Sequence, residues 1–239
     1  DASFLERMNY IGMKDGQRCL TIDVGKGTTD FSITRKLDAS KAVSEFRSGF
    51  VGAGNALSFA IFLNYMRALG GSRYMDLIEK VLNSEQARLY ELDNLIEEYK
   101  INWKDKKSSD FKTINVQTAS IELILDKIRE MGPIGDAYGE VRKLTESIAD
   151  NILKRLPEVK IDKIVISGRA FKFKMLKDVL ESKLREKFNV DRCYYDSKTA
   201  KSGCLFGACS DKQLSLSSSI VGVPFIIDAS KLTDEPEKL

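Results

Sequence analysis

The residues best placed for chemistry form one run of eight between Asp23 and Asp30, with the sequence DVGKGTTD. Gly25 and Gly27 carry no side chain, so backbone N–H groups around them can approach a polyanion closely. The two threonine hydroxyls that follow add donors for phosphate oxygens, and the leading carboxylate can hold Mg²⁺. This combination predicts a site for a phosphate chain and its metal ion.

Two strands must position this run. Arg18 to Asp23 and Thr28 to Arg35 alternate apolar and polar residues on either side of the glycines, which is the pattern of a β-hairpin with a tight turn. Neither G-x-x-x-x-G-K-[ST] nor G-x-G-x-x-G occurs around the run. A hairpin turn would therefore grip the phosphates, although a glycine-rich turn also fits a purely structural role.

The next segments complete the sheet and then become helical. Phe46 to Gly54 is a third strand-like run, after which Asn55 is placed to cap a helix from Ala56 to Leu69. From Ser84 on, apolar residues recur at alternating spacings of three and four on a charged background, which predicts an amphipathic helix. Its apolar stripe consists of Leu89, Leu92, Ile96, Tyr99 and Trp103.

The second half alternates between helix and strand. Lys163 to Ser167 (KIVIS) is a short apolar run typical of a buried strand, and the order around it indicates an α/β layer with a helical insertion. The other predicted elements are a short strand at Lys112–Val116, helices at Ala119–Met131, Val141–Ile152 and Met175–Leu184, a strand at Arg192–Asp196, a helix at Thr199–Ala208, a loop at Ser215–Ser219 and an edge strand at Ile220–Ile227.

Composition excludes several kinds of site and partner. Without histidine, Ser-His and Cys-His nucleophilic pairs and imidazole-based metal centres are impossible. The 38 Lys and Arg residues against 35 Asp and Glu give a net charge of +3, and the one basic run, near Lys104, is diluted by aspartates, so nucleic-acid binding is not favoured. The four cysteines contain no C-x-x-C pair, which favours small buried residues over disulfides.

The sequence predicts no membrane partner. No run approaches the ~18 to 20 consecutive apolar residues that a spanning helix needs, and no signal peptide opens the chain, so a cytoplasmic location is expected. Asp1 is not a natural start, so a fragment of a longer protein is also expected.

The run DVGKGTTD after an apolar strand resembles the second phosphate motif of the superfamily that contains actin, heat-shock chaperones and sugar kinases. Ile164 to Ala170 (IVISGRA) is similar to its adenosine motif, a buried strand that ends in small residues before a helix. Gly52 to Asn55 (GAGN) is similar to the glycine pair that opens the next helix. Ala200 to Ala208 is similar to the small-residue hinge helix, so the resemblance covers roughly residues 18 to 210.

The resemblance implies a role for each matching residue. Asp23 is expected to position Mg²⁺ through water, and Asp30 to be structural, capping backbone N–H groups. The residues expected to hold the phosphates of ATP are Gly25, Lys26, Gly27, Thr28 and Thr29. Those expected to border the nucleoside are Gly168, Arg169, Glu98 and Lys100. For the last two, a solvated helix face is the alternative.

Two departures from the family pattern leave questions open. Lys26 stands where the family has a small residue, so it either adds charge at the phosphates or points to solvent. Ser167-Gly168 replaces the usual glycine pair of the adenosine motif, which leaves the choice of base undecided.

The implied fold is a ribonuclease-H-like, actin-type ATPase lobe, α/β with a mixed sheet and an inserted, mostly helical subdomain. Residues 1–69 and 121–213 would form the lobe, 70–120 the subdomain, and 214–239 a C-terminal strand and tail. The family's first phosphate hairpin and catalytic carboxylate belong to the other lobe. No residue here is therefore assigned as catalytic, and ATP hydrolysis is expected only with that missing lobe.

The expected function is a nucleotide-driven conformational switch that uses ATP and Mg²⁺ and has the other lobe as its partner. A further protein partner or self-assembly stays open. Two alternatives share the fold: a lobe of a small-molecule or sugar kinase, and a non-catalytic assembly module. The full set of phosphate-motif residues argues against the second, while the acceptor-site carboxylate that would identify a kinase lies in the other lobe.

Overall fold

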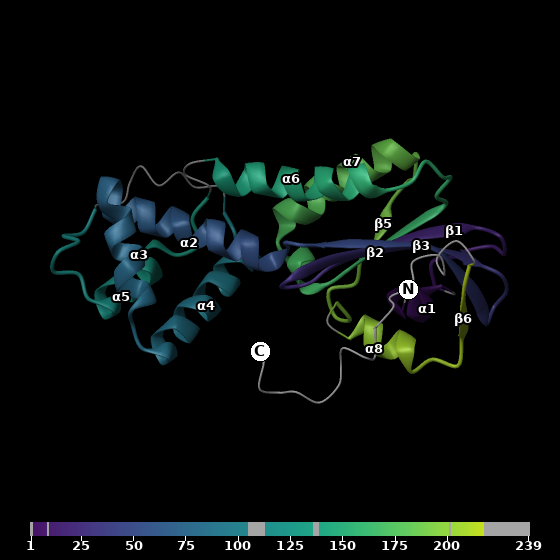
Figure 1. Cartoon of the computed structure of the whole chain (residues 1–239), viewed down its shortest axis with the longest axis horizontal. Coiled ribbons are helices and arrows are strands. Elements are labelled where there is room, and N and C mark those ends of the chain that lie inside the picture. Colours follow the sequence, from purple (N-terminus) through teal and green to yellow (C-terminus); the bar gives the residue numbers. More distant parts are fainter. Residues whose placement is uncertain (1, 9, 105–112, 136–138, 201, 218–239) are drawn as a thin grey trace, which may run out of the picture.

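One mixed sheet of six strands lies at the centre of the computed structural model, which describes residues 2–8, 10–104, 113–135, 139–200 and 202–217. The strand order is β5-β4-β1-β2-β3-β6 (Figure 1). β2 pairs antiparallel with β1 and with β3, whereas the other neighbours pair parallel. The strands are β1 Arg18–Val24, β2 Thr28–Lys36, β3 Lys41–Val51, β4 Lys163–Ser167, β5 Cys193–Tyr194 and β6 Gln213–Leu216. The predicted α/β class and hairpin are confirmed.

Helices cover both faces of the sheet. In Figure 1, α6 (Glu140–Arg155) and α7 (Lys174–Phe188) lie over one face, and α1 (Ala2–Arg7) and α8 (Gly203–Ala208) over the other. Ile164 and Ile166 of β4 belong to the large core that includes α6 and α7, whereas Val165 packs with Phe4 in a smaller core on the α1 side. The three central residues of KIVIS are therefore all apolar, because this strand is buried on both faces.

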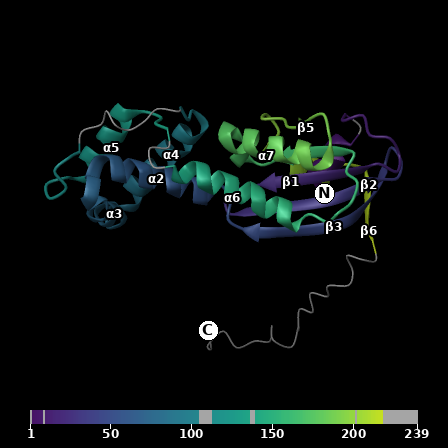
Figure 2. The same cartoon turned by 90° about the horizontal axis from the view of Figure 1, so that it is seen from above.

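A helical region extends beyond one end of the sheet (Figure 2). It begins with α2 (Gly54–Gly70), which continues through a 3₁₀ turn at Gly71–Arg73 into α3 (Tyr74–Leu82); α4 (Gln86–Ile101) and α5 (Ile121–Met131) follow. α2 contacts α3, α4, α5 and also α6, so this helix joins the region to the layers on the sheet.

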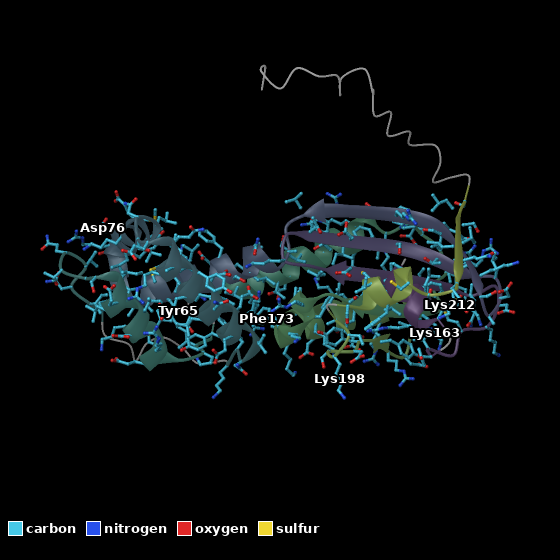
Figure 3. The ribbon with its side chains drawn as sticks, turned by 90° about the horizontal axis from the view of Figure 1, so that it is seen from below. Tyr65, Asp76, Lys163, Phe173, Lys198 and Lys212 are labelled. Atoms are coloured by element: carbon cyan, nitrogen blue, oxygen red, sulfur yellow. The ribbon has the colours of Figure 1, made fainter. Side chains whose placement is uncertain are left out.

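Two aromatic residues hold the helical region in place. The buried Tyr65 of α2 (labelled in Figure 3) donates its hydroxyl to Gly132 O (2.6 Å) and accepts from Ile134 N (3.3 Å), which ties α2 to the segment after α5. Trp103, just after α4, packs edge-on against Phe173, with 5.9 Å between ring centroids. The ring partner of Trp103 therefore lies just before α7, outside the helical region.

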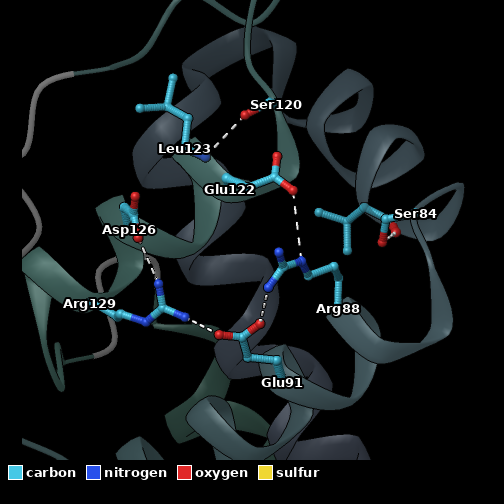
Figure 4. Close-up of polar contacts among 9 residues, drawn as sticks. Ser84, Arg88, Glu91, Ser120, Glu122, Leu123, Asp126 and Arg129 are labelled. Carbon is cyan, nitrogen blue, oxygen red and sulfur yellow. Dashed lines mark hydrogen bonds and ion pairs between the residues drawn. The ribbon is translucent and has the colours of Figure 1, made fainter.

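Charged residues link α4 and α5 on their solvent side (Figure 4). Glu91 of α4 pairs with Arg88 (2.9 Å) and with Arg129 of α5, and Arg129 also pairs with Asp126 (2.6 Å). Ser120 caps α5 by accepting from Leu123 N (3.2 Å). Exposed pairs contribute little individually, but a connected network helps to fix the position of α4, whose other side carries candidate site residues.

Several predicted boundaries are wrong. β3 begins at Lys41 rather than Phe46, because its first half pairs with both β2 and β6. Asn55 is not a helix cap: α2 begins at Gly54, and Asn55 N donates to Lys26 O (2.7 Å). Ser215 lies in β6 rather than in a loop.

Further predictions concern the insertion, the end of the chain and the cysteines. Thr113 to Val116 form no strand, and Ile114 N instead donates to Leu69 O (2.8 Å). The predicted edge strand Ile220–Ile227 lies outside the described residues. Cys19 and Cys193 are buried as expected, but Cys204 and Cys209 are exposed; all four are free thiols. Within the described part of the chain, every helix is too short or too polar to cross a membrane.

We predict that Tyr65→Phe lowers the free energy of unfolding by about 2 kcal/mol, because it leaves a buried carbonyl and a buried N–H without their partner. Denaturant unfolding of both proteins measures the difference. Tyr10→Phe is the control, since that ring is 84% exposed, and it should leave the midpoint unchanged. Equal midpoints for all three proteins would mean that the Tyr65 hydroxyl does not hold the region.

Candidate functional site

The turn between β1 and β2 is held by the start of α2. Gly54 N donates to Gly25 O (3.0 Å), and Asn55 N donates to Lys26 O (2.7 Å). A Cβ on Gly54 would lie 3.0 Å from Gly25 O, so a side chain there would push the two segments apart. These first N–H groups of α2 therefore fix the hairpin, and they are not free to bind a ligand.

The two threonines of the run differ in their surroundings. Thr29 is fully buried, and its hydroxyl donates to Gly52 O (3.0 Å) in the β3–α2 loop. Thr28 is exposed, and its hydroxyl donates to Asp30 Oδ2 (2.9 Å). The Thr29 hydroxyl thus already has a structural partner, and only Thr28 can reorient toward a ligand without breaking a buried bond.

A cleft of about 420 Å³ opens beside the turn, where the sheet meets the helical region. Five parts of the chain form it: the hairpin, the start of α2, one side of α4, the segment after β4, and the segment before α8 at Ala200. The lining residues are Asp23, Gly25, Lys26, Gly54, Tyr90, Asp93, Asn94, Glu97, Lys100, Gly168, Arg169, Ala170 and Ala200. Its size lies in the range of small-molecule sites.

The cleft brings together most of the predicted site residues from distant parts of the sequence. Those that line it are Asp23, Gly25, Lys26, Lys100, Gly168 and Arg169. Those that do not are Gly27, Thr28, Thr29 and Glu98. A larger hollow of about 590 Å³ lies around Asp191 and contains none of the predicted residues.

Asp23 lies directly opposite Asp30 in the β1–β2 pairing, so the two carboxylates are on the same face of the sheet. Cys204 Sγ donates to Asp23 Oδ2 (3.4 Å). Burial is the main cause that raises the pKa of Asp23 above its ordinary value; Asp30 adds to the rise, and the hydrogen bonds with Cys204 and Ser167 oppose it. A bound cation would therefore stabilise the ionised form of Asp23.

These two carboxylates fit a magnesium ion that keeps most of its water. Mg²⁺ is usually held by one or two carboxylates together with water and substrate phosphates. Among the described residues, no group of three or more His, Cys, Asp and Glu side chains comes together. Asp23, with Asp30 beside it, would hold such an ion only in company with phosphate oxygens.

Gly168, the residue just after β4, packs closely against the end of β1. Its φ is +99°, and a Cβ there would lie 2.3 Å from Val24 O and 2.7 Å from Asp23 Oδ1. Only glycine fits this conformation and contact. The close approach brings Arg169, which is exposed on a 3₁₀ turn at Arg169–Lys172, to the same cleft as Asp23.

Lys100 lines the cleft but is already engaged. It is only 3% exposed, and its ammonium donates to Glu97 Oε1 (2.6 Å), Ser58 Oγ (2.8 Å) and Gly54 O (3.4 Å). Burial lowers its pKa, and Glu97 opposes that effect. All three N–H donors are occupied, so Lys100 joins α4 to the start of α2 and holds Glu97 in the cleft.

Of the α4 residues that face the cleft, Tyr90, Asp93 and Asn94 were not assigned from the sequence. Tyr90, Asp93, Asn94 and Glu97 recur at spacings of three and four, as one helix face requires. Glu98 follows Glu97 by one residue, which turns it about 100° away and leaves it exposed. The polar spacing opposite the apolar stripe was the signal that could have identified this face.

Lys26 crosses the mouth of the cleft. Its ammonium pairs with Asp93 Oδ2 of α4 at 2.9 Å, and this hydrogen bond is the main cause that raises the pKa of Lys26. The sequence left open whether Lys26 points to solvent or adds charge at the phosphates. Its side chain is 59% exposed, but its ammonium is paired with Asp93 and is not simply solvated.

The small-residue helix is shorter than predicted and packs within this chain. α8 spans only Gly203–Ala208, and a Cβ on Gly203 would lie 3.7 Å from Ser3 Oγ of α1. Its apolar side chains Leu205 and Phe206 are 62% and 52% exposed. The glycine face of α8 therefore packs against α1 of this chain, and the exposed face with Leu205 and Phe206 is a different one.

A scan against models of protein families gives no match to this chain, and neither does a search of curated proteins.

We predict that Gly168→Ala destabilises the fold by about 3 kcal/mol, because the added methyl group meets Val24 O and the positive φ is strained. Gly27→Ala is the matched control: nothing lies within 4 Å of a Cβ there, so it should be tolerated. Denaturant midpoints and soluble yield are the measurements. Equal losses for both variants would contradict the close approach of β4 to β1.

We further predict that Asp23→Asn raises the free energy of unfolding at neutral pH. A carboxyl whose folded pKa is raised disfavours the fold once ionised, and this penalty is absent below its ordinary pKa of about 3.9. The advantage of the variant should therefore be largest near neutrality and vanish at low pH. Asp126→Asn, on the exposed side of α5, should show no such gain. A less stable Asp23→Asn protein at neutral pH would contradict the assigned burial.

Proposed function

We propose that this chain is a nucleotide-binding lobe of an actin-like or chaperone-like ATPase, with the ribonuclease-H-like fold that the phosphate motif implies. The observation that carries the proposal is the cleft itself. It unites the hairpin motif around Gly25 with the segment at Gly168, two stretches that were selected independently from the sequence. The antiparallel β1–β2–β3 unit flanked by parallel strands is compatible with the implied mixed sheet.

The phosphate chain of ATP would lie at the hairpin end of the cleft. Gly25 has no side chain to exclude a phosphate group, Lys26 supplies a cation, and Asp23 would hold Mg²⁺ through water. Of the three expected residues farther along the run, Gly27, Thr28 and Thr29, Thr28 is at the surface and can contribute its hydroxyl. The bound ion would supply charge neutralisation between the phosphate oxygens.

The nucleoside would lie between the segment after β4 and the exposed face of α4. Arg169 is exposed at the cleft, where its planar guanidinium can stack on a base. Tyr90 is 68% exposed on the other wall and offers a second flat surface. Glu97 is fixed by Lys100 and can accept hydrogen bonds from ribose hydroxyls.

Phosphoryl transfer needs groups on both sides of the γ-phosphate, including an oriented water molecule and positive charge. The residues of this cleft supply one side only. We therefore propose that a second lobe completes the site, that closure of the two lobes over Mg-ATP is the output, and that the lone chain binds ATP weakly, with a Kd on the order of millimolar.

Calorimetric titration with ATP, in Mg²⁺ and in EDTA, tests this function. We predict that Mg²⁺ tightens binding to the wild-type chain and that Asp23→Asn weakens the Mg²⁺-dependent affinity by at least about tenfold, or about 1.4 kcal/mol. Asp126→Asn, which changes charge far from the cleft, should behave as wild type. An unchanged affinity of Asp23→Asn, with and without Mg²⁺, would exclude the proposed metal position.

A further inference from the structure

An ion pair between Lys26 and Asp93 spans the mouth of the cleft. Lys26 comes from the hairpin turn and Asp93 from α4, so the pair connects the sheet to the helical region. Both residues also line an apolar hollow of about 510 Å³ between α2, α3 and α4. The pair thus lies between the cleft and that hollow.

The backbone of Lys26 is fixed, whereas its side chain can change position. Its backbone carbonyl accepts from Asn55 N, and the neighbouring Gly25 carbonyl accepts from Gly54 N, which fixes the turn. The ammonium is carried on a flexible four-carbon stem and can reach groups on either side of the turn. The charged groups that face it are Asp93, Glu97 and Arg169.

The position of Lys26 gives it two competing anionic partners. Asp93 carries one negative charge, whereas the phosphate chain of a nucleotide carries several and would lie beside the turn. Exposed ion pairs contribute little free energy, so breaking the contact with Asp93 costs little. A phosphate chain in the cleft would therefore win the competition for the ammonium.

We propose that Asp93 is a positioning residue that holds the Lys26 ammonium in reserve by pairing with it. A bound polyphosphate would replace Asp93 as the partner of Lys26, and the ion pair between α4 and the hairpin would break. This inference rests on the proposed function and deepens it. α4 also carries Tyr90, Asn94 and Glu97 into the cleft. Phosphate occupancy would therefore remove the direct side-chain tie between the hairpin and this wall of the cleft, while Lys100 keeps α4 joined to the start of α2.

The sign of one mutational effect tests the proposal. In Asp93→Asn the competitor is gone, so ATP should bind about two- to fivefold tighter than to wild type, whereas loss of an ordinary binding residue would weaken affinity. Inorganic tripolyphosphate should show the same gain, since the competition concerns phosphate alone. Asp93→Glu, which can keep the ion pair, should restore the wild-type affinity.

A second variant, Lys26→Met, tests whether the gain depends on the Lys26 ammonium. It should weaken the binding of both ligands, and in Lys26→Met/Asp93→Asn the gain from the second change should disappear. Thermal unfolding of each variant checks that the fold is intact. Wild-type binding of ATP together with an unchanged or weaker Asp93→Asn would overturn the reserve role while leaving the site in place. Absence of wild-type binding to both ligands at millimolar concentration would overturn the proposed function and this inference together.

Discussion

The cleft depends on two backbone hydrogen bonds, from Gly54 N to Gly25 O and from Asn55 N to Lys26 O. Through them the first turn of α2 fixes the shape of the hairpin turn, and through α2 the sheet is joined to the helical region. Lys100 adds a third tie, because its ammonium also contacts Gly54 O. Hairpin, α2 and α4 therefore meet at one point, and the cleft is the space they leave there.

At this junction the ammonium of Lys100 is buried beside Glu97 and Ser58. A buried ammonium is unfavourable unless its hydrogen bonds are satisfied, and here all three are made. The same satisfaction removes Lys100 from ligand contact and leaves Glu97 as the group presented to the cleft. Asp23 is the opposite case: its carboxylate is partly buried beside Asp30, and a bound cation would relieve that repulsion.

The elements with strong local signals could be predicted from the sequence. The hairpin strands, β4, α5 and α6 follow from alternation, apolar runs and helical periodicity, and the structure confirms them. Elements that depend on distant partners were missed. α1 has too short a pattern to predict, and its helix is stabilised by α8 and by the sheet face around Val165.

The candidate site shows the same division. Gly25 and Gly168 were found through the motifs that contain them. At Gly168 the backbone itself requires glycine, because φ is positive and Val24 O lies close, whereas a Cβ at Gly25 would make only an ordinary contact, 3.5 Å from Thr28 O. Thr29 and Lys100 have the right residue types, but buried hydrogen bonds that no single sequence reveals already engage them. Asp93 was not assigned because a charged helix face is ordinarily solvated, and only tertiary packing places this one beside the hairpin.

The central claim is that a nucleotide binds between the hairpin and α4. The most direct test is an amide NMR titration of the ¹⁵N-labelled chain with Mg-ATP. The account predicts progressive shifts that cluster at Gly25 to Thr28, at Gly168 to Ala170 and along the cleft side of α4, with the hollow around Asp191 unaffected. Shifts confined to the Asp191 end of the sheet, or a spectrum that does not change at millimolar Mg-ATP, would contradict it.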